Sequence, residues 1–91
     1  MATRQSIDEC LQRCDNAIEQ AQEQYTEGLR QEHYHDLDYT NALQQLEASY
    51  NEVCQLANSS NSQQREILHR KRLQLQALQN QMILLNHDRP I

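Results

Sequence analysis

Three cysteines are the residues whose type and spacing come closest to a metal site. Cys10 and Cys14 lie four positions apart, so both thiols face one side of a helix, and Cys54 falls at about the same level on an antiparallel second helix. Three thiolates and one imidazole are a known zinc ligand set. The candidate imidazole, His69, lies one position past an apolar residue and should point outward, and the spacing is not CxxC. The pattern therefore favours small buried cysteines over a metal site.

A second cluster combines imidazoles with carboxylates. On a helix two histidines two positions apart diverge by about 200°, so these could share a metal ion only within a turn. In a turn the same residue types commonly serve as solvated or capping side chains. We therefore expect capping rather than ligation from the residues of this cluster, which are Glu32, His33, His35, Asp36 and Asp38.

One basic cluster could bind phosphate groups: Arg65, Arg70, Lys71 and Arg72. No aromatic residue lies among these cations, and the chain carries a net charge of −5. Residues 1–61 hold 3 basic and 11 acidic side chains (net −8), whereas residues 62–91 hold 5 and 2 (net +3). This asymmetry favours a solvated basic face that pairs with acidic neighbours within the fold. An accessory nucleic-acid-binding protein is the alternative function.

Catalysis has little support in this sequence. The chain has no Gly-rich phosphate loop, no HExxH motif and no nucleophile elbow, and it has a single glycine, Gly28. We therefore predict a protein that is not an enzyme and needs no cofactor. The odd number of cysteines indicates reduced thiols, and the longest apolar run is only Met82 to Leu85. These features, with no signal-peptide pattern, predict a cytoplasmic protein without a membrane partner.

The elements that position these residues are helices. One Gly and one Pro leave almost nothing to break a helix, and apolar residues recur at spacings of four and three in three stretches. Helices are therefore predicted at about residues 6–31, 36–58 and 61–87, with a turn near residues 32–36. The tyrosines in these stripes should lie at the edge of the core, with their hydroxyls in water. The stripes are Ile7, Leu11, Cys14, Ile18, Ala21 and Tyr25; Tyr39, Leu43, Leu46, Tyr50, Val53 and Ala57; and Leu68, Lys71, Leu75, Leu78, Met82 and Leu85.

Two helix starts carry capping signals. Ser6 is a plausible N-cap of the first helix, with Glu9 completing a capping box. The run NSSNS at residues 58–62 favours a turn before the third helix. Either of two pairs in this region fits its capping box, namely Ser60 with Gln63 or Asn61 with Gln64.

The simplest fold that buries all three stripes is all-α. We predict one domain over residues 1–91, an antiparallel three-helix bundle with heptad-type seams. A long helical hairpin that dimerises is the alternative. Because no Pro or pair of Gly residues forces a stop, one continuous helix from about residue 6 to residue 57 also stays open.

The third helix has more apolar residues than one seam needs. Leu73, Ala77, Ile83 and Leu84 lie off its stripe, so this helix should contact both other helices or a second copy of the protein. The resulting hypothesis is a non-enzymatic protein-interaction or self-associating module, whose partner is another protein or the chain itself.

Two segments also resemble a known family. RQEHYHDLDYTNALQQLE and SQQREILHRKRLQLQALQNQMILL, together with the MATRQS start, are similar to the YtzC-like family of small uncharacterised helical proteins from spore-forming Firmicutes. The resemblance covers nearly the full chain. It implies a bacterial cytoplasmic protein of fewer than a hundred residues, and it carries over no catalytic or binding residue.

Overall fold

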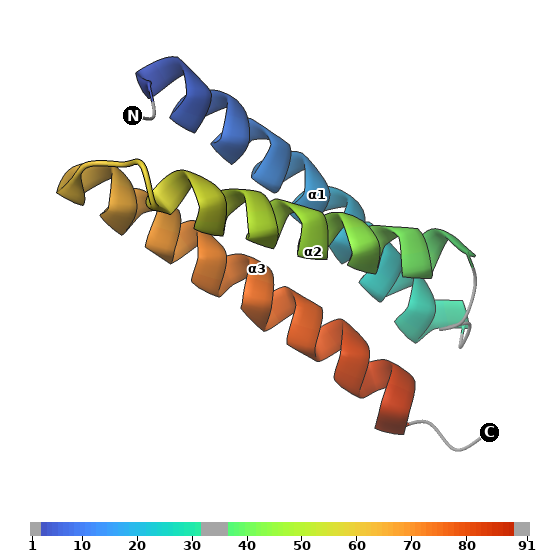
Figure 1. Ribbon diagram of the computed structural model, residues 1–91. Helices are drawn as coiled ribbons and strands as arrows, with labels where there is room; N and C mark the ends of the chain where they lie inside the picture. Colours follow the sequence, from blue (N-terminus) through green and yellow to red (C-terminus); the bar gives the residue numbers. More distant parts are fainter. Residues whose placement is uncertain (1–2, 32–36, 89–91) are drawn as a thin grey trace.

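The computed structural model describes residues 3–31 and 37–88, which form three α-helices and no strand. They are α1 (Arg4–Gln31), α2 (Leu37–Ala57) and α3 (Ser62–Asp88). Successive helices run in opposite directions, and every pair of helices is in contact (Figure 1). The predicted all-α three-helix bundle is therefore confirmed. One continuous helix through residues 6–57 is wrong, because α1 and α2 pack against each other. The predicted turn at residues 32–36 lies outside the described residues.

The start of α1 differs from the predicted one. The backbone N–H of Ser6 donates to the Thr3 side-chain oxygen at 3.0 Å, and the Thr3 hydroxyl donates to Ser6 Oγ at 2.9 Å. Thr3 is therefore the N-cap, and Ser6 already lies within the first helical turn. The capping box predicted for Ser6 and Glu9 is wrong, because the Thr3 side chain accepts a hydrogen bond from a free backbone N–H one turn earlier.

The start of α3 has a complete capping box. The Gln64 N–H donates to Asn61 Oδ1 at 2.9 Å, and the Asn61 N–H donates to Gln64 Oε1 at 3.1 Å. This confirms the second of the two predicted pairs. Ser60 is instead buried, and its hydroxyl donates to the Leu56 carbonyl at the end of α2. The turn between α2 and α3 is thus held by side chains at both of its ends.

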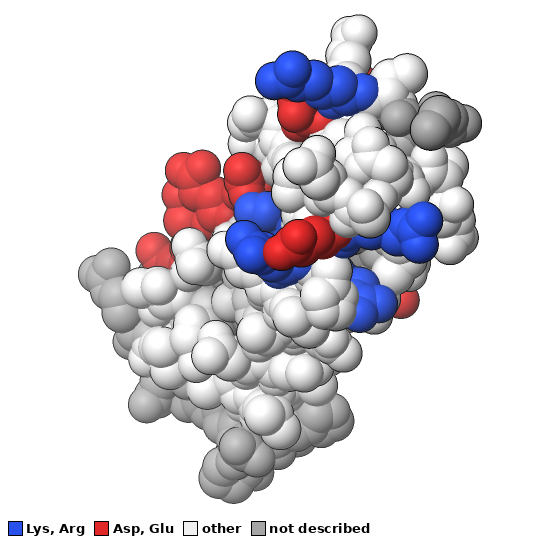
Figure 2. Space-filling view, turned by 90° about the vertical axis from the view of Figure 1, so that its left-hand side faces the viewer, with Lys and Arg blue, Asp and Glu red and all other residues white. Residues whose placement is uncertain are grey.

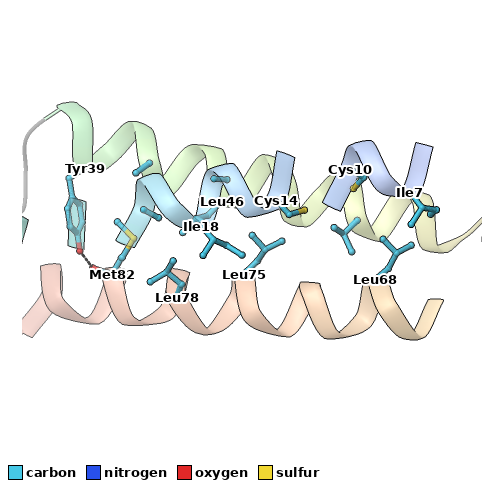
Figure 3. Close-up of a cluster of buried hydrophobic side chains, with 14 residues drawn as sticks. Ile7, Cys10, Cys14, Ile18, Tyr39, Leu46, Leu68, Leu75, Leu78 and Met82 are labelled. Atoms are coloured by element: carbon cyan, nitrogen blue, oxygen red, sulfur yellow. Dashed lines mark hydrogen bonds between the residues drawn. The ribbon is translucent and has the colours of Figure 1, made fainter. Parts of the chain in front are cut away.

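The core lies along the line where the three helices meet, and it follows the predicted stripes (Figure 3). Residues beside a stripe are also buried where they are small, as with Cys10, Ala17 and Ala42. Stripe residues that lie at the ends or the edges are only partly buried, among them Leu11, Leu43 and Tyr50. The buried stripe residues are Ile7, Cys14, Ile18 and Ala21 of α1, Tyr39, Leu46 and Val53 of α2, and Leu68, Leu75, Leu78 and Met82 of α3.

One buried hydrogen bond joins α2 to α3. Tyr39 is 1% exposed, and its hydroxyl donates to the Met82 carbonyl at 2.7 Å (Figure 3). The expectation that this hydroxyl reaches water is wrong, because the carbonyl on α3 offers a partner inside the core. A buried phenol needs such a partner, and this one fixes the position of α3 along α2.

Replacing Tyr39 with Phe tests how much this hydrogen bond contributes to the stability of the fold. We expect Tyr39→Phe to lower the free energy of unfolding by about 1 kcal/mol, because it removes one buried hydrogen bond and little apolar surface. Urea denaturation followed by circular dichroism measures the change. Tyr50→Phe, on the same helix but partly buried, is the matched control and should leave the stability unchanged. Equal stability of Tyr39→Phe and the parent protein would contradict the prediction.

Candidate functional site

The solvent-facing side of α3 carries a line of exposed apolar residues. Leu73 is 49% exposed and Leu84 is 58% exposed, and Ala77 between them is also exposed. With 100° of rotation per residue, these residues lie on the side of α3 opposite Leu75 and Met82, which face the core. We call Leu73, Ala77, Asn80 and Leu84 the outward stripe, because their spacings of four, three and four place them on one line.

Ile83 lies apart from the outward stripe. It is 37% exposed and precedes Leu84 by one position, which turns its side chain by about 100° toward α2. The structure therefore brings together three of the four predicted interaction residues and separates the fourth. It also shows that α3 contacts both other helices without using any of the four as a buried residue.

Along its own length the outward stripe is surrounded by uncharged residues, while the exposed pair of Arg70 and Glu66 lies on the same side of α3 in the turns before Leu73. No residue from position 73 to position 86 is Lys, Arg, Asp or Glu, and the exposed neighbours Gln74, Gln76 and Gln81 are amides. Figure 2 shows the charged side chains gathered in the upper part of the face in view, while its lower part, where the C-terminal half of α3 lies, is white. An apolar line in an uncharged surface favours protein contact over binding of a polyanion.

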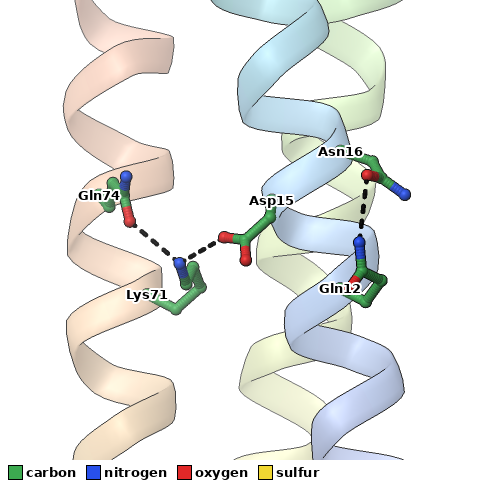
Figure 4. Close-up of polar contacts among 5 residues, drawn as sticks. All are labelled: Gln12, Asp15, Asn16, Lys71 and Gln74. Atoms are coloured by element: carbon green, nitrogen blue, oxygen red, sulfur yellow. Dashed lines mark hydrogen bonds and ion pairs between the residues drawn. The ribbon is translucent and has the colours of Figure 1, made fainter.

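Two of the four predicted basic residues are neutralised by carboxylates. Arg70 pairs with Glu66 on the same helix at 2.9 Å, and both side chains are exposed. Lys71 bridges to α1, where its Nζ lies 2.6 Å from Asp15 Oδ1, and it also donates to Gln74 Oε1 at 3.2 Å (Figure 4). Lys71 thus occupies its stripe position by covering the core with its aliphatic stem while its charge meets α1.

The other two basic residues point in a third direction. Arg65 and Arg72 line a hollow between α2 and α3, together with His69. Arg65 Nε donates to the Ser60 carbonyl at 3.1 Å, and Arg72 Nη2 lies 2.9 Å from His69 Nδ1. Residues that are adjacent in the sequence are therefore spread around the helix, and the four cations do not form one continuous basic face.

The ion pair between Arg13 and Glu52, which links α1 to α2, was not predicted from the sequence. Arg13 donates to Glu52 Oε1 through Nε at 3.0 Å and through Nη2 at 2.5 Å. These hydrogen bonds lower the pKa of the Glu52 carboxyl, and a hydrogen bond from Cys10 lowers it further. A usable signal existed, because Arg13 and Glu52 have opposite charges and lie at similar distances from the predicted turn.

The cysteines do not converge on one point. Cys10 and Cys14 are fully buried in the core, and burial is the largest cause that raises the pKa of each thiol. Both thiols are therefore protonated at neutral pH, which suits neither a nucleophile nor a metal ligand. Cys54 is half-buried on α2 and lines the hollow that contains Arg65. Over residues 3–31 and 37–88, no three His, Cys, Asp or Glu side chains lie close enough to hold a metal ion.

One other candidate feature can be placed only in part. Most of the cluster of histidines and carboxylates lies at residues 32–36, outside the described residues, and Asp38 is in the first turn of α2. An acidic residue there interacts favourably with the helix dipole. Among the described helices, none has the length and apolar character that crossing a membrane requires.

Thiol accessibility can be measured directly. We expect iodoacetamide to label the native protein at Cys54 alone, because Cys10 and Cys14 are buried and their raised pKa values keep them protonated. Labelling in concentrated urea should modify all three cysteines and serves as the control. Intact-mass and peptide mass spectrometry count and locate the modified thiols. Rapid native labelling of Cys14 would contradict the described core.

The acid dependence of stability tests the pair formed by Arg13 and Glu52. Because folding lowers the pKa of Glu52, ionised Glu52 stabilises the fold above its ordinary pKa of about 4.5, and this stabilisation is lost as the pH falls through the lowered value. Glu52→Gln should therefore lower the Tm at neutral pH, and the difference from the parent protein should shrink below about pH 4.5. Thermal melts followed by circular dichroism measure both. A Tm difference that stays constant to pH 3 would disprove this role.

Comparison with known proteins gives a family without a described activity. Residues 1–84 match the family described as "Protein of unknown function (DUF2524)". The chain is 56% identical over 84 residues to "Uncharacterized protein YtzC" of Bacillus subtilis (strain 168), and the match covers 92% of this chain and 93% of that protein. No solved structure matches the chain. These findings confirm the resemblance noted in the sequence, and the chain belongs to the DUF2524 family, whose function is unknown.

Proposed function

We propose that this protein is a non-enzymatic, cytoplasmic module that pairs with a second copy of itself through the outward stripe of α3. The exposure of Leu73 and Leu84 is the observation that carries the proposal. Two leucines and an alanine aligned on one helix face leave an apolar strip in water, and covering such a strip is favourable by about 25 cal/mol for each Å² of apolar surface removed from water. The three free thiols favour a reducing compartment.

The spacing within the outward stripe favours an antiparallel pair. The sequence spacings of four, three and four are the same read in either direction, so the stripe is symmetric about a point between Leu78 and Gln79. In an antiparallel pair Leu73 of one copy meets Leu84 of the other at each end of the contact. Ala77 and Asn80 meet in the middle, where their small side chains allow the helices to approach closely. Such a contact is isologous, as in most homodimers.

The charges around α3 favour a protein partner over nucleic acid. The outward stripe has no charged neighbour from position 73 to position 86, so two copies can approach there without repulsion between like charges. Arg70 and Lys71 are already paired with Glu66 and Asp15. Because the remaining basic residues of the cluster face another direction, the accessory nucleic-acid-binding function is the weaker alternative.

Analytical ultracentrifugation tests self-association. We expect the average mass to rise with protein concentration across the micromolar range. Leu73→Glu and Leu84→Glu should each weaken association by about tenfold or more, since burying a leucine is worth about 1.5–3 kcal/mol. Leu29→Glu is the matched control, because Leu29 on α1 is 50% exposed and lies away from the stripe. A monomer throughout this range, or an equal effect of the control substitution, would refute the proposal.

Disulfide trapping tests the orientation of the same pair. In a Cys54→Ser background, a chain with both Leu73→Cys and Leu84→Cys should form covalent dimers under mild oxidation. Chains with only one of these substitutions should not, because equal positions of an antiparallel pair lie about 16 Å apart at 1.5 Å per residue. Efficient trapping by a single substitution would indicate parallel pairing and would contradict the proposed arrangement.

A further inference from the structure

A hollow of about 400 Å³ lies between the C-terminal half of α2 and the N-terminal half of α3. Its apolar part consists of Val53, Ala57 and Leu68. Two polar groups also border it, the Cys54 thiol of α2 and the amide of Asn58 in the turn directly after α2. The hollow has the volume of a small-molecule site. It lies on a different side of α3 from the outward stripe, so a ligand there would leave the proposed dimer contact free.

The polar side of the hollow is cationic and has no acidic residue. Arg65, His69 and Arg72 line it from one face of α3, because their spacings of four and three place them on one line. Over the described residues, neither arginine has an ion pair, whereas Arg13, Arg70 and Lys71 each meet a carboxylate. The hollow therefore contains two guanidinium groups whose charge no carboxylate balances.

Arg72 is the least satisfied of these groups. Its Nε is buried and has no hydrogen-bond partner within the described part of the chain. Its Nη2 lies 2.9 Å from His69 Nδ1, and a guanidinium nitrogen can only donate, so Nδ1 is the acceptor in this contact. Among the described residues, Arg65 has only its Nε occupied, by the Ser60 carbonyl, which holds the side chain beside the hollow. The buried Arg72 Nε is not accessible from the hollow, but Nη groups of both guanidiniums remain available for an oxyanion.

We infer that this hollow binds a small phosphate monoester. Planar guanidinium groups match the geometry of phosphate oxygens and form strong charge-assisted hydrogen bonds with them. Arg65 and Arg72 contact the phosphoryl oxygens, and the Asn58 amide donates a further hydrogen bond at the rim. The ester's organic part packs on the partly exposed Ala57, beneath which Val53 and Leu68 are buried, so an ester binds more tightly than inorganic phosphate.

Cys54 provides a reporter for this site. Because its thiol borders the hollow and the other two thiols are buried in the core, a bound ligand should slow alkylation of Cys54 alone. The experiment measures the rate of Cys54 alkylation by iodoacetamide in increasing phenyl phosphate. Inorganic phosphate, phenol and sodium chloride at matched ionic strength serve as comparisons. We expect protection by millimolar phenyl phosphate, weaker protection by inorganic phosphate, and none by phenol or chloride.

Substitutions distinguish a built site from general attraction of anions. Arg65→Gln and Arg72→Gln should each weaken protection by phenyl phosphate about tenfold, as expected for the loss of a charge-assisted hydrogen bond. Arg70→Gln removes the same charge from the same helix, but Arg70 faces solvent beside Glu66, so protection should be unchanged. Thermal melts establish that each variant is folded, and Arg65→Gln alone suffices if Arg72→Gln is not. Absence of protection, or equal loss in Arg70→Gln, would overturn the inference.

Discussion

The position of α3 against both other helices is the constraint on which the rest of this structure depends. Leu68, Leu75 and Met82 are fully buried where the three helices meet, and the Tyr39 hydroxyl fixes the height of α3 at Met82. The bundle is long and thin, 47 × 18 × 15 Å, so its core is a single line of side chains. A helix in such a core can bury only one stripe. All other residues of α3 must therefore face solvent, the side of α1 or the side of α2.

Each of these three remaining directions has a distinct chemistry. Toward α1, Lys71 covers the core and forms an ion pair with Asp15, while the outward side from position 73 to position 86 carries an apolar line among uncharged side chains. Toward α2, two arginines that have no carboxylate partner in the described part of the chain border a hollow that is partly lined by apolar residues. If α3 were rotated about its axis by 100°, the angle between successive residues, different side chains would face α1, α2 and solvent. The packing of Leu68, Leu75 and Met82 thus determines which surface is available for each kind of partner.

The sequence predicted those features that depend on periodicity and local capping. The helical class and the buried stripes follow from spacings of four and three, and the pair formed by Asn61 and Gln64 follows from capping chemistry. Ser6 was misassigned because Thr3, three positions earlier, offers the same capping chemistry. The Tyr39 hydroxyl was misassigned because its acceptor lies on a helix distant in sequence.

The hollow could not be predicted, because its lining combines residues of two helices and depends on their relative rotation. Within α3, neighbouring cations in the sequence suggested one basic patch, but each step along the helix turns the side chain by 100°. Arg70 and Lys71 therefore point away from Arg65 and Arg72, and each pairs with a different carboxylate. Only the alignment of the C-terminal half of α2 with the N-terminal half of α3 brings Asn58 and Cys54 beside Arg65 and Arg72.

The burial of Cys10 and Cys14 also limits how oxidation can join copies of this protein. With both of these sulfurs enclosed among core side chains, a folded copy presents only the sulfur of Cys54 to its surroundings. A molecule with a single linking point can be tied to one neighbour and no more. Oxidising conditions would therefore end in covalent pairs of folded molecules, whereas larger cross-linked aggregates would require the bundle to open first.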